Sequence, residues 1–334
     1  MPETPDPDER EPYPSHDVIV IGGGPAAYTA MIYLAGEQLD AVCLEGFESG
    51  GQISRASKVL NYPGLPDSPA GVDIPDSMRR QAEGLGATFE FDEAHTIEAI
   101  HGDRFAVHGS MGSWAANALI VATGSRPVEL GLESEKRLQN RGVAYCALCD
   151  GPFFTGKRVA VVGGGDASVE QAITLTNLGC KVVVIHRRDE FRAAQSGQSF
   201  LHNHPDVSTL TPYRVDEILA TPEGIVGGIR VEHTETGEQH EETLDAVFVA
   251  IGHKPASDLV ADLVDRTEAG HIQVRGRTGM TSCPGVFAAG DVIDPSYRQA
   301  VTAAASGCVA AIDAARWLGH RAIDNNLAAA STNR

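Results

Sequence analysis

The sequence predicts an α/β protein with two Rossmann-like domains, each a three-layer (ββα/βαβ) arrangement. A series of strand, glycine-rich turn, helix and strand occurs at residues 17–45 and again at residues 159–188. The chain has 334 residues, which is more than one hydrophobic core usually serves. Recurrence of the pattern makes coincidence a poor explanation, so we expect two dinucleotide-binding domains.

Composition narrows the classes of function. The formal net charge is −19, with 26 Lys and Arg against 45 Asp and Glu, which argues against a nucleic-acid surface or an anionic membrane as partner. No apolar stretch approaches the roughly 18 residues that span a bilayer. Residues 1–16 are acidic and proline-rich, unlike a targeting peptide, and are predicted to be a disordered tail. Six scattered cysteines do not suggest a disulfide-stapled secreted protein, so a cytoplasmic location is expected.

The first nucleotide turn, residues 22–27, comes directly after a β-branched strand. Gly22 permits a sharp turn, Gly24 lets a pyrophosphate approach the backbone, and Ala27 allows close packing of helix on strand. The next strand, residues 41–44, ends in Glu45, whose carboxylate can accept hydrogen bonds from a ribose. The alternative is a glycine-rich connection with no ligand. The complete series favours a site for an unphosphorylated adenosine such as that of FAD.

The second nucleotide turn, residues 163–168, repeats the pattern with Gly163, Gly165 and, in the third position, Ser168. The strand after it, residues 181–185, does not end in an acid but runs into a basic cluster of His186, Arg187, Arg188 and Arg192. Guanidinium groups bind a 2′-phosphate through charge-assisted hydrogen bonds, whereas a carboxylate would repel it. This turn therefore favours NADPH, unless the arginines are only a solvated basic cluster.

An apolar strand at residues 285–289 ends in Gly290 and Asp291, and a helix rich in small residues extends from 299 to 314. Asp291 could accept hydrogen bonds from the ribityl chain of a flavin. It could equally serve as the N-cap of a helix.

Cys146 and Cys149 lie between the two nucleotide turns. Two cysteines separated by two residues can close a small disulfide ring, and their surroundings can make one thiol reactive. A zinc site completed by His202 and His204 is the alternative, but the long intervening segment fits poorly with zinc-ligand spacing. Asp150, next in the chain, can act as a proton donor or as a turn residue. The remaining thiols are expected to be inert: Cys43, Cys180, Cys283 and Cys308.

Taken together, these motifs resemble those of the low-molecular-weight, bacterial-type thioredoxin reductases over nearly the whole chain, from about residue 17 to about residue 318. The matching segments are residues 22–26, 50–52, 61–64, 122–124, 146–151, 163–166, 186–193, 250–253 and 290–300. Two departures stand out. Ser168 occupies a position where this family usually has Ala, and residues 195–205 differ from the family pattern, which leaves the docking surface of the protein partner open.

The resemblance implies an FAD domain formed by residues 17–126 and 254–334, interrupted by an NADPH domain at 127–253 that carries the dithiol. It also implies a homodimer and a domain rotation about the two crossings. The implied FAD residues are Gly22, Gly24, Pro25, Ala26, Glu45, Gly51, Gln52, Asn61, Thr123, Gly124, Gly290, Asp291, Arg298, Gln299 and Ala300. The implied NADPH residues are Gly163, Gly165, Asp166, Ser168, His186, Arg187, Arg188, Arg192, Ile251 and Gly252.

The chemistry explains why two dinucleotides accompany one dithiol. NADPH delivers a hydride, whereas a disulfide is reduced by electrons that reach sulfur. A flavin can accept the hydride and pass its electron pair to the disulfide. By resemblance, Cys149 faces the flavin, Cys146 attacks the disulfide of thioredoxin, Cys149 resolves the mixed disulfide, and Asp150 handles the proton. The sequence thus predicts an NADPH-dependent thioredoxin reductase.

Four other functions share parts of this pattern. One is the reductase of another redoxin, and one is the flavoprotein of an alkyl hydroperoxide reductase, which would carry a long thioredoxin-like portion before residue 17. A flavin-dependent dithiol oxidase is the third, although such proteins generally lack the arginine cluster. The fourth is a sensor that binds dinucleotides without turnover, against which the retained Cys146, Cys149 and Asp150 speak.

Overall fold

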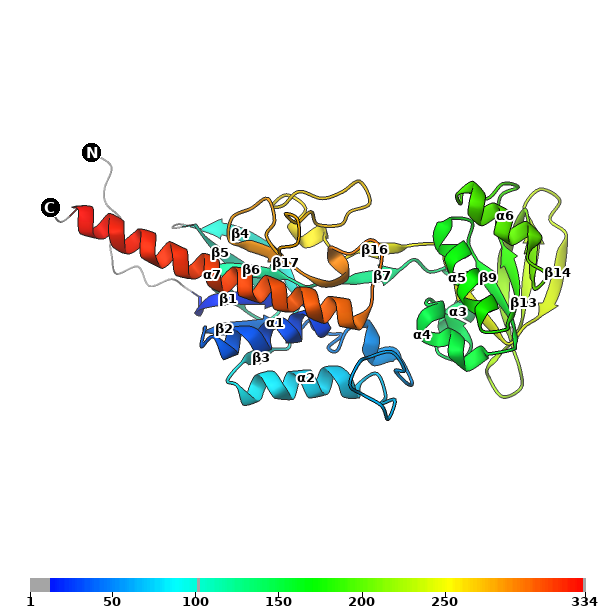
Figure 1. The fold of residues 1–334 in the computed structure, drawn as a ribbon, viewed down its shortest axis with the longest axis horizontal. Helices are drawn as coiled ribbons and strands as arrows, with labels where there is room; N and C mark the ends of the chain where they lie inside the picture. The colour runs from blue at the N-terminus through cyan, green and yellow to red at the C-terminus, as the bar shows by residue number, and fades with distance from the viewer. Residues whose placement is uncertain (1–12, 101–102, 333–334) are drawn as a thin grey trace. The chain divides into compact units, whose positions relative to one another are not determined.

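The computed structural model describes residues 13–100 and 103–332. The chain divides into two compact units (Figure 1): the first comprises the described residues of Met1–Arg126 and Pro255–Arg334, and the second is Pro127–Lys254. Most of the tail predicted at residues 1–16 lies outside the described residues. Ser15 and His16 instead begin the first strand, because they pair with Ala115 and Ala116 of the neighbouring strand.

The first unit is built on a seven-stranded sheet in the order β3-β2-β1-β6-β5-β4, with β17 also paired to β6. Strands β1, β2, β3, β6 and β17 are parallel to one another, and β4, β5 and β6 form an antiparallel meander. The strands are β1 (Ser15–Ile21), β2 (Ala41–Leu44), β3 (Thr88–Glu90), β4 (Ala94–Ile100), β5 (Arg104–Gly109), β6 (Ser113–Val121) and β17 (Val286–Ala288).

The central strand β1 is buried on both faces, as expected of a parallel strand. Val18 and Val20 pack against helices α1 (Pro25–Gly36) and α7 (Ala300–Thr332), whereas Ile19 and Ile21 point into a second core beneath the segment that carries Val260. Helix α2 (Asp73–Gly84) packs on α1. No helix in the described part of the chain has the length and apolarity needed to cross a membrane.

The second unit has three layers, as the sequence predicts. A parallel sheet in the order β11-β10-β9-β15-β8 lies between helices on one face and an antiparallel sheet, β12-β13-β14, on the other. Its strands are β8 (Val143–Ala144), β9 (Arg158–Val162), β10 (Lys181–Ile185), β11 (Val207–Leu210), β12 (Tyr213–Ala220), β13 (Val226–His233), β14 (Gln239–Thr243) and β15 (Ala246–Val249). Its helices are α3 (Glu133–Leu138), α4 (Ala147–Asp150), α5 (Asp166–Asn177) and α6 (Gln195–Asn203).

The chain crosses between the units twice, and the crossings pair with each other. β7 (Ser125–Pro127) and β16 (His253–Pro255) form a two-stranded sheet. The backbone N–H of Val128 donates to Gly252 O at 2.9 Å, and that of Ala256 donates to Gly124 O at 2.9 Å. Two segments far apart in the sequence therefore run together between the units.

Candidate active site

The first nucleotide turn connects β1 to α1. Gly22 has a φ of +128°, and a Cβ added there would lie 2.2 Å from Ala122 O, so only glycine fits. Gly24 is the N-cap residue of α1 and contributes no side-chain cap, while Pro25 and Ala26 open the helix. Gly51 approaches Gly24 from the next loop, with 3.9 Å between its Cα and a Cβ built at Gly24. The uncapped amides and the side-chain-free approach fit a pyrophosphate.

Residues predicted for the same dinucleotide converge on this edge of the sheet from distant parts of the chain. The Gln52 side chain donates a hydrogen bond to Ser125 O, and the Ser125 hydroxyl donates to the Asp291 carboxylate at 3.3 Å. The Asn61 amide donates to Gln299 Oε1 at 3.2 Å. Thr123, just before Gly124, donates through its hydroxyl to Ala256 O at 2.6 Å. The structure therefore joins motifs that the sequence presents separately.

Asp291 lies in the short helix η4 (Gly290–Val292), directly after β17. Burial raises the pKa of its carboxyl to about 6, and the charge of Asp294 adds to the rise, while the hydrogen bond from Ser125 opposes it. Asp294 in turn accepts the backbone N–H groups of Ser296, Tyr297 and Arg298 at 2.8–2.9 Å. This holds Arg298 at a φ of +48° just before α7, whose first residue is Ala300.

Glu45 lies at the end of β2, as predicted, but its side chain is only 4% exposed. Its Oε1 accepts hydrogen bonds from the Tyr28 hydroxyl at 2.5 Å and from Arg79 Nε at 3.1 Å. The sequence predicts a ribose contact for this carboxylate, but neither of these two partners. Glu45 is thus part of a buried polar network at the end of β2.

The second nucleotide turn has a backbone very similar to the first. Gly163 has a φ of +155°, and a Cβ there would lie 2.4 Å from Ala250 O. Gly165 is an N-cap residue without a side-chain cap, and Asp166 accepts the backbone N–H of Ala194 at 2.7 Å. Ser168 is fully buried and donates its hydroxyl to Gly165 O at 2.6 Å.

The structure separates His186 from the three arginines of the basic cluster. Arg187, Arg188 and Arg192 are exposed, and none forms a salt bridge with any residue in 13–100 or 103–332. His186 is only 6% exposed, stacks on Phe191 with ring centroids 5.4 Å apart, and has no partner for Nε2 among the described residues. Burial lowers its pKa.

The placement of His186 depends on Gly164 in the second nucleotide turn. A Cβ built at Gly164 would lie 2.3 Å from the His186 ring. The neutral imidazole therefore packs directly against the second nucleotide turn. The three guanidinium groups remain at the surface, where they are accessible to a phosphate. Ile251 and Gly252, predicted for the same nucleotide, come after β15, and Ile251 is 38% exposed.

Cys146 and Cys149 form a disulfide with their Cα atoms 5.3 Å apart. Cys146 is the N-cap residue of α4, and its Sγ accepts the backbone N–H of Cys149 at 3.2 Å. Both cysteines are half-buried, whereas Leu148 between them is 62% exposed. Burial raises the pKa of the adjacent Asp150 carboxyl to about 6. A disulfide therefore lies beside a carboxyl that can hold a proton near neutral pH.

The comparisons with known proteins agree with this geometry. The profile of the family described as "Pyridine nucleotide-disulphide oxidoreductase" matches residues 16–307. The thioredoxin reductase of Mycolicibacterium smegmatis is 42% identical over 306 residues, which cover 92% of this chain and 97% of that protein. The chain belongs to the thioredoxin reductases of this family.

Two further relatives extend the comparison. NADPH-dependent thioredoxin reductase 3 of Arabidopsis thaliana is 39% identical over 308 residues, 90% of this chain and 58% of that protein. The structure of thioredoxin reductase from Giardia duodenalis superposes with a TM-score of 0.85 at 34% identity, covering 92% of this chain and 99% of that chain. The predicted fold class, two Rossmann-like sheets in a thioredoxin reductase, is confirmed.

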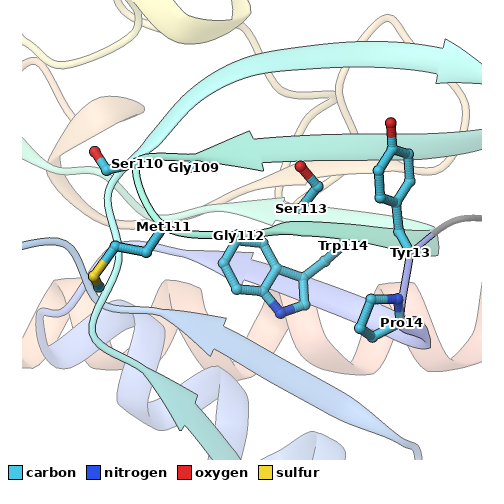
Figure 2. A pocket seen from close by; sticks show the side chains of 8 residues that line it. All are labelled: Tyr13, Pro14, Gly109, Ser110, Met111, Gly112, Ser113 and Trp114. Atoms are coloured by element: carbon cyan, nitrogen blue, oxygen red, sulfur yellow. The ribbon is translucent and has the colours of Figure 1, made fainter.

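Four further cysteines and a surface hollow lie outside the motifs that the sequence predicts for this site, although the Cys43 thiol donates to Gly22 O at 3.2 Å. Cys43 and Cys180 are buried free thiols, and no group of three or more potential metal ligands occurs among the described residues. A cavity of about 560 Å³ lies at the β5–β6 hairpin, lined by Tyr13, Pro14 and residues 109–114. Figure 2 shows Trp114 between Met111 and Pro14 in this hollow, which contains none of the predicted site residues.

The sequence does not predict three residues of the site: Tyr28, Arg79 and Ser125. Tyr28 lies on the buried face of α1 and is indistinguishable in sequence from an ordinary core aromatic. Arg79 belongs to a polar helix with several charged residues, so nothing marks it out. Ser125 comes directly after the 122–124 motif, and that adjacency was the one available clue.

Proposed function

We propose that the protein is an NADPH-dependent thioredoxin reductase that uses FAD and the Cys146–Cys149 pair. The observation that carries the proposal is the disulfide itself, located in the same unit as the second nucleotide turn and its exposed arginines. Membership of the family supports both dinucleotides, and one relative is named as NADPH-dependent. The net reaction transfers two electrons and a proton from NADPH, with one more proton from solvent, to the disulfide of thioredoxin.

FAD, when bound, supplies the conversion of a hydride into an electron pair for sulfur. The first nucleotide turn, Glu45 and Asp291 would hold it, since these residues provide uncapped amides and carboxylate acceptors for pyrophosphate and hydroxyl groups. The second nucleotide turn would hold the pyrophosphate of NADPH, and Arg187, Arg188 and Arg192 its 2′-phosphate.

Within the dithiol, Cys146 acts as the attacking nucleophile. The Cys149 N–H that reaches Cys146 Sγ stabilises a thiolate at Cys146 more than at Cys149. The Cys146 thiolate attacks one sulfur of the thioredoxin disulfide and the other sulfur leaves as a thiolate. Cys149 then attacks Cys146 Sγ, releases reduced thioredoxin and restores the intramolecular disulfide.

Asp150 is the acid that protonates the departing thiolate. With its pKa at about 6, the carboxyl is protonated below that pH and loses its proton above it, so the acid-dependent step slows as pH rises through 6. Asp150→Asn should lower thioredoxin reduction by about 100-fold, should keep reduction by NADPH, and should remove this pH inflection. Single-turnover oxidation of the dithiol from pH 5 to 8 measures it, with Asp206→Asn at an exposed carboxylate as control.

The decisive experiment mixes purified FAD-loaded protein with NADPH and thioredoxin and monitors NADPH oxidation. Cys146→Ser should keep FAD and accept hydride but fail to turn over thioredoxin, and Cys149→Ser should accumulate a mixed disulfide through Cys146. Normal turnover by Cys146→Ser would contradict the assigned roles. Turnover with another redoxin alone would move the proposal to that partner, and oxidation of NADPH by no disulfide at all would favour a sensor.

Three further predictions accompany the proposal. The predicted FAD domain (17–126 and 254–334) and inserted NADPH domain (127–253) would correspond to the two units, which divide after Arg126 and after Lys254. The homodimer remains a prediction that analytical ultracentrifugation would check. The cytoplasmic location likewise stays a prediction.

A further inference from the structure

The Glu45 carboxylate is almost completely removed from solvent, so its charge depends on the groups around it. Burying a carboxylate without a partner is strongly unfavourable, and removing one partner of a buried pair leaves an uncompensated charge. Two donors meet Glu45 Oε1, one from α1 and one from α2: the Tyr28 hydroxyl and Arg79 Nε. The other oxygen, Oε2, receives no hydrogen bond from the residues that the structure describes.

Arg79 is fixed from several sides. Besides Glu45, its guanidinium contacts Glu83 one helical turn later on α2 and lies over the ring of Phe89 at 4.7 Å from the centroid. Its side chain is 34% exposed. Because the guanidinium is planar and held on three sides, it presents Nε to Glu45 in one orientation.

Tyr28 connects the same carboxylate to the loop of Gly50 and Gly51. Its hydroxyl donates to Glu45 Oε1 and accepts the backbone N–H of Gly50 at 3.2 Å. Burial, together with the hydrogen bond to Glu45, raises the pKa of Tyr28, so the hydroxyl stays protonated and remains a donor. Gly51, next in the chain, approaches Gly24 of the first nucleotide turn.

We propose that Arg79 is a positioning residue of the FAD site: it fixes Glu45 through Oε1, so that Oε2 accepts the hydroxyls of the adenosine ribose. This inference rests on the proposed function, because it presumes that FAD occupies the first nucleotide turn. A ribose diol offers two O–H donors, and a carboxylate oxygen without a donor has room for them. Without Arg79, the Glu45 carboxylate is no longer held in this orientation, and Oε2 is no longer directed toward the ribose.

The test compares FAD binding to the apoprotein, measured by quenching of flavin fluorescence. Arg79→Met and Glu45→Gln should each weaken FAD by roughly 10- to 100-fold, the range for losing a hydrogen bond to a charged group. The double variant should bind FAD about as well as whichever single variant binds it less tightly, because Arg79 acts through Glu45. Arg80→Met is the matched control, because Arg80 is the next residue on α2 and, among the described residues, donates hydrogen bonds only to Asp76 O and Ser77 Oγ. Its FAD affinity should stay within twofold of the wild-type value.

A second ligand separates positioning from a general loss of structure. Flavin mononucleotide lacks the adenosine, so Arg79→Met should leave its affinity unchanged. Equal losses for both flavins, or losses for Arg79→Met and Glu45→Gln that multiply in the double variant, would overturn the inference. If Arg79→Met fails to fold, Arg79→Lys restores the charge without the fixed fork and should give an intermediate FAD affinity; wild-type affinity there would also count against it.

The outcomes also distinguish this inference from the proposed function. If the wild-type protein binds no FAD, the proposed function fails and the inference fails with it. If the wild-type protein binds FAD tightly and Arg79→Met does too, only the role of Arg79 is wrong.

Discussion

The two nucleotide turns share a backbone and differ in the residues at the end of the second strand of each. Gly24 and Gly165, the N-cap residues of α1 and α5, have φ of −104° and −106° and ψ of −176° and −177°. Neither carries a side-chain cap, and in each turn the first glycine lies against a carbonyl of a neighbouring strand end, at Ala122 or Ala250. The part of each site that would hold a pyrophosphate is therefore nearly identical.

The strand ends β2 and β10 differ in charge and in exposure. Glu45 after β2 is buried and its charge is matched by Arg79, whereas Arg187 and Arg188 after β10 are exposed and form no salt bridge within the described residues. A buried, paired carboxylate suits a ligand that is bound permanently. Exposed guanidinium groups suit a ligand that must enter and leave at each turnover. We infer that the turn of each site binds the pyrophosphate that all dinucleotides share, and that the strand end selects which dinucleotide binds.

The largest effect is expected from blocking one turn at a time. Gly22→Ala and Gly163→Ala each place a methyl group within 2.4 Å of a carbonyl oxygen, in a backbone conformation that alanine rarely adopts. With strain of about 1–3 kcal/mol, affinity for the affected nucleotide should fall by up to about 100-fold. Gly22→Ala should lose flavin absorbance, and Gly163→Ala should keep the flavin but raise KM for NADPH.

Each glycine variant should therefore affect only its own nucleotide, and this independence of the two turns is what the experiment tests. Gly36→Ala at the end of α1, where an added Cβ meets nothing within 4 Å, serves as control and should bind both nucleotides normally. Loss of flavin in Gly163→Ala, with secondary structure intact by circular dichroism, would show that the two turns do not act independently.

An effect of at most similar size, but more selective, is expected from the arginines. Arg187→Ala combined with Arg188→Ala removes the charge-assisted hydrogen bonds to a 2′-phosphate, so kcat/KM for NADPH should fall roughly 10- to 100-fold while that for NADH changes little. Steady-state kinetics with both nucleotides measures this. Arg214→Ala removes another exposed arginine of the same unit, one already paired with Glu232, and should have no effect. Equal decreases of kcat/KM for NADPH and NADH would show that these arginines do not bind the 2′-phosphate.

Much of this could be predicted from sequence because the decisive residues are local. The positions of Gly22 and Gly163, each between a β-branched strand and a helix, are enough to predict the two turns. Cys146 and Cys149 form a disulfide between residues only three positions apart. The fold class could be predicted from the same short segments. Resemblance to a family supplied the order of the domains, which periodicity alone does not give.

The contacts that the sequence did not reveal join distant segments. Arg79 reaches Glu45 only because α2 packs beside α1, and Ser125 reaches Asp291 only because two strand ends meet at one edge of the sheet. His186 was grouped with the arginines because it adjoins them in sequence. Its burial against Gly164 results from the way the chain turns after β10, and adjacency in sequence could not predict it.

The smallest expected effect concerns the third position of each turn, where the chain has Ala27 in one and Ser168 in the other. Both residues are fully buried, and the Ser168 hydroxyl is satisfied by Gly165 O within its own turn. Ser168→Ala therefore removes one internal hydrogen bond and leaves no buried donor unpaired, which should change the free energy of unfolding by about 1 kcal/mol or less. KM for NADPH should change by less than about twofold, a limit set by the same small free energy.

The reciprocal variant, Ala27→Ser, completes the test, because its hydroxyl can donate to Gly24 O across the same backbone geometry found between Ser168 and Gly165. Thermal unfolding and nucleotide titration of both variants measure the exchange. If Ser168→Ala instead changed the affinity for NADPH by tenfold or more, the serine hydroxyl would contact the nucleotide directly. The turn would then contribute to the choice between dinucleotides, and the inference that only the strand end selects the dinucleotide would be wrong.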